Sequence, residues 1–128
     1  MEIDRLDHLV LTVADIDRTV AFYRDVLGMQ PVVFAGGRTA LSFGRAKTDL
    51  HQVGREFEPK AARPVAGSAD VCLIARDPLE VVVDELRAHG IPVVEGPVQR
   101  TGATGPIASV YVRDPDGNLV EISNYRTG

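Results

Sequence analysis

Four side chains of metal-binding type stand out in this 128-residue sequence. They are His8, His51, Asp70 and Glu121. Two imidazoles and a carboxylate form a set that Zn, Ni, Mn, Fe or Co accepts, with coordination positions left open for water or substrate. The residue types therefore suggest a divalent metal centre, provided that the fold brings the four side chains to one surface.

The chain repeats itself once, which is the first evidence on how these residues are positioned. Residues 7–15 (DHLVLTVAD) align without a gap with residues 69–77 (ADVCLIARD). Both segments are rich in Leu, Val and Ile and end in aspartate, as expected of a strand that leads into a helix. His8 and Asp70 occupy equivalent positions in this alignment.

The helix that follows each strand has matching boundaries in the two copies. Asp15 and Asp77 are expected to be the N-caps, and Pro78 fits the first helical position of the second copy. Gly28 and Gly90 lie equally far beyond these caps, where glycine commonly ends a helix in the left-handed conformation. The two helices should therefore have equal length.

Short strand-like segments follow each helix, so that each half is predicted to be βαβββ. We expect these strands at 31–34, 38–44 and 48–53, and then at 92–95, 107–113 and 118–123. The tetrapeptide Asp114-Pro115-Asp116-Gly117 predicts a tight hairpin turn. The prediction is one α+β domain, 1–128, with curled mixed sheets that form a metal-binding cavity: module one at 1–53, a connector at 54–68 and module two at 69–128.

Side-chain alternation along the strands indicates where the polar residues point. If Leu9, Leu11 and Val13 lie under the helix, His8 lies on the uncovered face, and so does Asp70 in the second copy. Aligning Leu50-His51-Gln52 with Val120-Glu121-Ile122 makes His51 the counterpart of Glu121. We therefore predict an approximate two-fold relation that superposes His8 on Asp70 and His51 on Glu121, with all four on uncovered faces.

The opening DHLVLTVADIDRTVAFYRDVLGM and the ending YVRDPDGNLVEISNY carry a family resemblance. The chain resembles the vicinal oxygen chelate superfamily, which includes glyoxalase I, fosfomycin-resistance proteins, methylmalonyl-CoA epimerase, extradiol dioxygenases and bleomycin-resistance proteins, and within it a group of small glyoxalase-domain proteins. The resemblance covers essentially the whole chain. It implies paired βαβββ modules around a metal, with ligands from the first and last strands of each module.

On the positions of this sequence, the resemblance implies His8, His51, Glu121 and Asp70 as ligands, with Glu121 also catalytic. Asp70 stands where several members present a histidine, which favours three protein ligands. The alternatives are a capping or core role for His8, a solvent-facing strand position for His51, and for Asp70 a turn cap or an orienting role beside a ligand.

Other residues are expected around the cavity rather than at the metal. Ser109 and Tyr111 alternate away from the helix-facing valines and could contact substrate, although plain packing is the alternative. Arg63 of the connector could hold an anionic substrate group or simply be solvated. Cys72 shares the uncovered face, but a free cysteine is most often a small buried hydrophobe.

Composition limits the partners. The net charge of -4 argues against nucleic acid and anionic lipid, so a small-molecule substrate is expected. A single cysteine forms no internal disulfide, and the sequence shows no signal segment or apolar run long enough to span a membrane, which predicts a cytoplasmic protein. Unpaired sheet edges and a concave surface favour a homodimer.

Two classes of function compete. The first is a metal-dependent enzyme, a glyoxalase-like lyase or isomerase or a dioxygenase, with fosfomycin-type epoxide opening as a lesser option. The second is a protein that binds and sequesters a small molecule, as the bleomycin-resistance members do. Those members typically lack the metal ligands, so the presence of His8, His51 and Glu121 favours the enzyme.

Overall fold

The computed structural model describes residues 1–126, and the chain divides into two compact units, of which the first is Met1–Ser68 and the second begins at Ala69. Residues 127–128, which the predicted second module includes, lie outside the described part. Within residues 1–126, neither helix is long and apolar enough to span a membrane.

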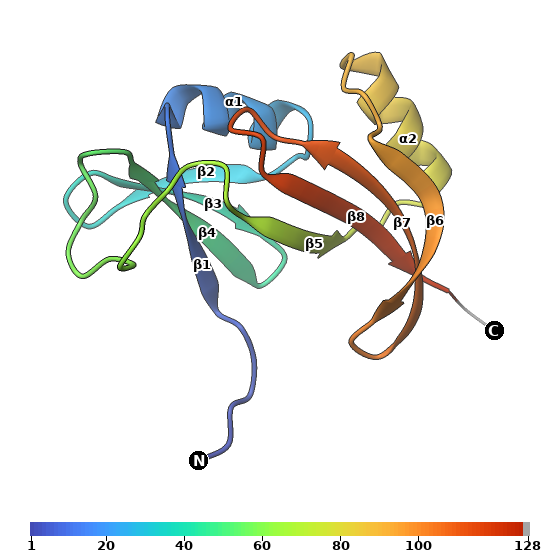
Figure 1. Cartoon of the computed structure of the whole chain (residues 1–128), viewed down its shortest axis with the longest axis horizontal. Helices are drawn as coiled ribbons and strands as arrows, with labels where there is room; N and C mark the ends of the chain where they lie inside the picture. Colours follow the sequence, from blue (N-terminus) through green and yellow to red (C-terminus); the bar gives the residue numbers. More distant parts are fainter. Residues whose placement is uncertain (127–128) are drawn as a thin grey trace. The chain divides into compact units, whose positions relative to one another are not determined.

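The first unit contains one βαβββ module (Figure 1). Its elements are β1 (His8–Val13), α1 (Ile16–Asp25), β2 (Gln30–Phe34), β3 (Arg38–Phe43) and β4 (Ala46–Gln52). The strands lie in the order β1-β4-β3-β2; β1 runs parallel to β4, and the other neighbours are antiparallel. The predicted connector, 54–68, contains no helix or strand.

The second unit repeats this topology. Its elements are β5 (Asp70–Ile74), α2 (Leu79–Ala88), β6 (Glu95–Gly102), β7 (Gly105–Arg113) and β8 (Leu119–Tyr125). The order β5-β8-β7-β6, with β5 parallel to β8, is the counterpart of the first sheet. The predicted α+β architecture of two βαβββ modules is therefore confirmed.

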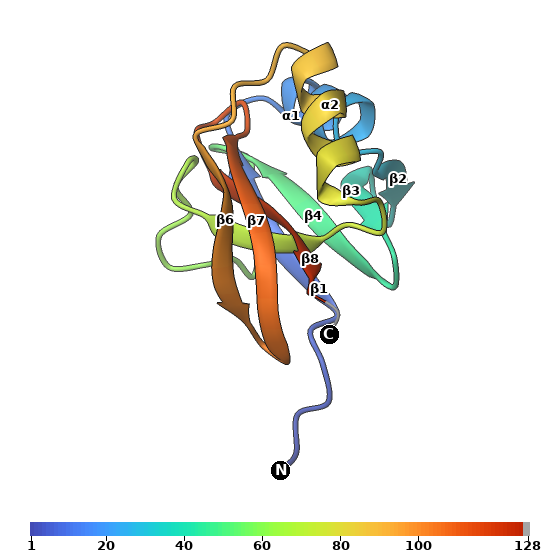
Figure 2. The same ribbon diagram turned by 90° about the vertical axis from the view of Figure 1, so that its right-hand side faces the viewer.

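Each helix covers one face of its own sheet, as α2 does in Figure 2. In the first module, Leu11, Val13 and Leu50 lie on the covered face and are at most 6% exposed. In the second, Val110 and Val120 are fully buried. This alternation confirms the predicted covered face, and it leaves the polar side chains of the same strands on the opposite, open face.

The predicted N-cap is confirmed in the first module and is wrong in the second. Asp15 is the N-cap of α1, where its Oδ1 accepts a hydrogen bond from Arg18 N at 3.1 Å. The prediction of Asp77 as N-cap of α2 is wrong, because Pro78 takes that position and makes no side-chain cap. The carbonyl oxygen of Asp77 instead accepts a hydrogen bond from Asn124 Nδ2 at 3.0 Å, which ties the turn to the sheet.

The strand predicted at 92–95 is also wrong. Strand β6 runs from Glu95 to Gly102, and its pairing with β7 is irregular between Glu95 and Val98, a stretch that includes Pro97. An edge strand tolerates proline, because its missing N–H need not face a neighbour. The glycines and the proline of this edge strand hid it from the composition pattern.

The contrast between the two helix starts gives a stability prediction. Asp15→Ala should lower the free energy of unfolding by about 1 kcal/mol, because the N-terminal amides of α1 lose their acceptor. Asp77→Ala is the matched control and should leave stability nearly unchanged, since its side chain caps nothing. Urea denaturation followed by circular dichroism measures both; equal losses would contradict the assignment of the caps.

Candidate functional site

The open face of the first module brings His8 close to a carboxylate that the sequence analysis did not select. His8 Nε2 lies 3.8 Å from Asp49 Oδ2, on the neighbouring parallel strand. On the other side of the ring, His8 Nδ1 is 2.8 Å from Asp7 Oδ1. An ionised carboxylate only accepts, so Nδ1 carries the hydrogen, and in the neutral ring Nε2 keeps its lone pair.

Asp49 is a largely buried carboxylate whose contacts are ionic rather than hydrogen-bonded. Its side chain is only 16% exposed, and Oδ1 has no hydrogen-bond partner among the described residues. Lys47 Nζ lies 3.0 Å from Oδ1, but outside hydrogen-bonding geometry. An imidazole nitrogen next to a carboxylate matches the donors that divalent metals take, and a carboxylate on the far ring nitrogen commonly orients such a histidine.

His51 lies elsewhere on the same face. It pairs in register with Thr12, four residues beyond the His8 pair, which corresponds to about 13 Å along the strands. Its side chain is buried, with the ring edge-on to Phe57 at a centroid distance of 5.8 Å. A small cavity there is bounded by Pro59 and Lys60 of the connector. The first module thus brings His8 to Asp49 rather than to His51.

Strand register explains this difference and corrects the predicted two-fold relation. Cys72 pairs with Glu121 in the second module, and the equivalent pair in the first is Val10 with Asp49. Asp49 is therefore the counterpart of Glu121, and the alignment of His51 with Glu121 is wrong. His51 corresponds instead to Ser123.

A pair of amides marks the correct register. Gln52 accepts a hydrogen bond from Ile16 N at 3.1 Å and donates to the carbonyl of Ala14, at the turn between β1 and α1. Asn124 donates to the carbonyls of the corresponding turn in the second module, with Ala75 O at 3.2 Å. Gln52 lies three residues after Asp49, and Asn124 lies three residues after Glu121. This shared spacing in the sequence indicates that Asp49 and Glu121 are equivalent positions.

In the second module, Glu121 rests on two buried hydroxyls. Ser109 Oγ donates to Glu121 Oε2 at 2.6 Å, and Ser109 Oγ and Ser123 Oγ are 2.7 Å apart. Both serines are fully buried. Glu121 also lines a cavity of about 450 Å³, together with Cys72, Arg100 and other residues. Asp70 shares this open face but is exposed and pairs in register with Leu119.

The residues predicted to contact substrate have different environments. Ser109 is fully buried, and its hydroxyl donates to Glu121. Tyr111 accepts a hydrogen bond from Arg100 Nε at 3.0 Å, and Arg63 is exposed on the connector. Sequence reasoning missed Arg100 because it missed strand β6.

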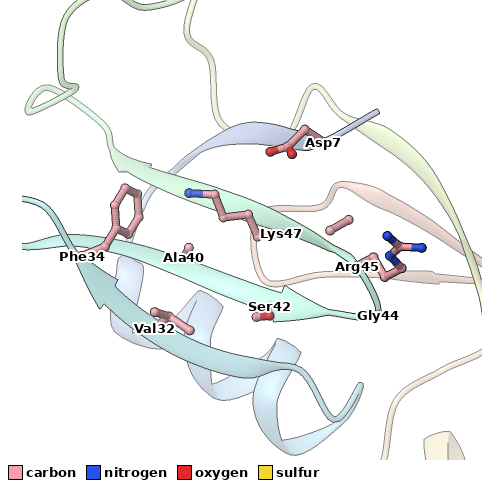
Figure 3. A pocket seen from close by; sticks show the side chains of 9 residues that line it. Asp7, Val32, Phe34, Ala40, Ser42, Gly44, Arg45 and Lys47 are labelled. Atoms are coloured by element: carbon pink, nitrogen blue, oxygen red, sulfur yellow. The ribbon is translucent and has the colours of Figure 1, made fainter. Parts of the chain in front are cut away.

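A second cavity of about 450 Å³ lies on the open face of the first module (Figure 3). Figure 3 shows Lys47 extended toward Phe34, with its Nζ 3.9 Å from the ring centroid, and Arg45 farther along. Val32 and Ala40 supply apolar surface. This cavity offers both apolar contacts and cationic groups close to the His8–Asp49 pair.

Among residues 1–126, no group of three or more His, Cys, Asp or Glu side chains is gathered as a metal site. The contacts made by the predicted ligands are instead formed within each module separately. His8 meets Asp49 in the first, and Glu121 meets two serines in the second.

Comparison with known proteins identifies the family and the fold of the chain. Residues 5–122 match the Glyoxalase/Bleomycin resistance protein/Dioxygenase superfamily, and the chain belongs to this family. Its paired βαβββ modules are the glyoxalase fold, as the resemblance had implied.

Individual relatives refine this placement. The chain is 60% identical over 125 residues to virulence protein STM3117 of Salmonella typhimurium, covering 98% of this chain and 87% of that protein. The crystal structure of STM3117 superposes with a TM-score of 0.97, over 98% of this chain and 100% of the other. Glyoxalase domain-containing protein RDO1 of Mycosarcoma maydis is 54% identical, with coverages of 98% and 71%. Lactoylglutathione lyase of Agrobacterium tumefaciens is 26% identical, with a TM-score of 0.74 and coverages of 96% and 95%.

The environment of Cys72 gives a reactivity prediction. Burial raises the pKa of the Cys72 thiol, and the nearby charge of Glu121 raises it further. Iodoacetamide should therefore modify native Cys72 roughly tenfold or more slowly at pH 8 than it modifies the urea-unfolded chain, because the thiolate is the reactive form. Mass spectrometry of timed samples measures both rates, and equal rates would contradict the shift.

Proposed function

We propose that this chain is a metal-dependent enzyme that acts on a small molecule, with glyoxalase-like lyase or isomerase chemistry, or dioxygenation, as the reaction. The observation that carries the proposal is the His8–Asp49 pair. His8 Nε2 lies 3.8 Å from Asp49 Oδ2, and Asp7 contacts the other ring nitrogen. Asp49 Oδ1 has no hydrogen bond among residues 1–126, and Lys47 Nζ lies 3.0 Å from it. In the first module we propose His8 and Asp49 as the residues that would hold a divalent metal, and in the second module, taken by itself, we propose Glu121 as a ligand.

When bound, such a metal would polarise two neighbouring substrate oxygens and stabilise the negative charge that develops on them. The residues of the chain supply the remaining functions. Glu121 lines a cavity and has a carboxylate that can take a proton from a substrate carbon. Lys47 and Arg45 can pair with an anionic substrate group, while Phe34 and Val32 contact its apolar part.

This assignment changes the expected role of two predicted ligands. His51 packs against Phe57 and is proposed as a structural residue that fixes the connector on the sheet. Asp70 is exposed on the edge strand β5, and we propose that it supports the site rather than binds the metal directly. Glu121 keeps its predicted role.

Calorimetric titration of the chelator-stripped protein with Zn, Ni, Mn and Fe(II) tests the proposal. His8→Ala and Asp49→Ala should each weaken metal binding by at least about 100-fold, since loss of a supporting group alone typically costs 10- to 100-fold. Glu121→Ala should show a comparable loss. His51→Ala is the matched control and should bind as the parent does, and Asp70→Ala should show a mild loss.

Two outcomes would contradict the metal assignment. If no metal binds more tightly than about millimolar affinity, the enzyme proposal fails, and the sequestering role of bleomycin-resistance members replaces it. If His51→Ala loses binding while Asp49→Ala retains it, the ligand in the first module is His51.

We also propose a homodimer. The edge strands β1 and β5 carry Val10 and Ile74, which are 42% and 53% exposed on the open faces of their sheets. Exposed apolar side chains on an edge strand are commonly covered by a partner chain. Sedimentation velocity at micromolar concentration should therefore give the mass of two chains, and Val10→Lys should shift it toward one. A monomeric parent protein would contradict the proposal.

A further inference from the structure

Hydrogen-bonding groups form an unbroken chain on the open face of the second module. Cys72 Sγ lies 3.3 Å from Ser123 Oγ, and Ser123 Oγ lies 2.7 Å from Ser109 Oγ. Ser109 Oγ lies 2.6 Å from Glu121 Oε2, and Ser123 Oγ reaches the same oxygen at 3.4 Å. The four side chains come from β5, β7 and β8, which are neighbours in the sheet.

The number of available hydrogens determines which group donates and which accepts in each of these hydrogen bonds. An ionised carboxylate only accepts, so Ser109 spends its single hydroxyl hydrogen on Glu121. Ser109 must then accept from Ser123, whose hydrogen is therefore also committed. With its own hydrogen committed, Ser123 can only accept in its contact with the Cys72 thiol, whose Sγ lies 3.3 Å away. Every hydrogen thus points toward Glu121.

The result is a carboxylate that is held through one of its two oxygens. Ser109 donates to Oε2, Ser123 donates to Ser109, and both serines are fully buried, so this oxygen is held from the buried side of the carboxylate. Within residues 1–126 no hydrogen bond reaches Oε1, while Glu121 lines the cavity. Hydrogen bonds from neutral donors to a charged acceptor are short and strong, which suits a fixed orientation.

We propose that Ser109 and Ser123 are positioning residues that present Glu121 to the site through Oε1 alone. The inference rests on the proposed function and concerns the part of it in which Glu121 serves as a metal ligand. It adds that the carboxylate binds through a single oxygen, and that the hydrogen bond to the other oxygen sets its orientation. Ser109 contributes most, because it donates to Oε2 directly, whereas Ser123 donates to Ser109.

The experiment compares metal affinities, by calorimetric titration with Zn and Mn, across a graded series of variants. Ser109→Ala should weaken binding by about 10- to 100-fold, Ser123→Ala by less, and Ser109→Thr, which keeps the hydroxyl, should retain most of the parent affinity. Thr19→Val is the control, because it removes another buried hydroxyl, in α1, that donates to a backbone carbonyl far in sequence from Glu121.

A second measurement uses the metal-free protein. A buried serine hydroxyl donated to a carboxylate should give a slowly exchanging proton signal in NMR spectra, and this signal should vanish in both Ser109→Ala and Glu121→Ala. Its absence from the parent spectrum would overturn the hydrogen-bond chain whether or not metal binds.

The two proposals fail differently. If the parent binds no metal but shows the hydroxyl signal, the metal assignment fails and the hydrogen-bond chain stands. If the parent binds metal and Ser109→Ala binds equally well, or if Thr19→Val loses as much as Ser109→Ala, the positioning role is overturned while the metal assignment stands.

Discussion

The parallel pairing of the first and last strands in each module is the constraint on which the site depends. This pairing sets which side chains meet on the open face, and a slip by one residue would turn every side chain to the other face. Gln52 and Asn124 hold the register by binding the turn that leads from the first strand into the helix. Each amide thus ties the final strand of its module to the turn that follows the first strand.

The same register carries different chemistry in the two modules. In the first, the position equivalent to Glu121 holds Asp49, which faces an imidazole and has an oxygen without a hydrogen bond among residues 1–126. In the second module, the Glu121 carboxylate accepts a hydrogen bond from Ser109, whose hydroxyl in turn contacts that of Ser123. In the first module Lys47 Nζ compensates this buried oxygen by charge, at 3.0 Å, whereas in the second module a hydrogen bond satisfies one oxygen of the carboxylate.

The sequence contained enough information for the fold but not for the full site. The repeat of DHLVLTVAD predicted both modules, and helix caps and glycines predicted α1 closely. Strand β6 was missed because Gly96 and Pro97 obscure an edge strand. Asp49 was missed because two strands distant in sequence pair through backbone bonds that composition does not encode, and histidine was the more conspicuous residue nearby.

The long separation between the paired strands also has a consequence for how the protein folds. Strands β2, β3 and β4 are joined by short turns and pair locally, whereas β1 meets β4 only across nearly the whole length of its module. Closing a long loop costs more entropy than forming a hairpin, so this contact is expected to come late on the folding pathway. His8 and Asp49 belong to that last contact, so a partly folded first module would contain the antiparallel strands and no ligand pair.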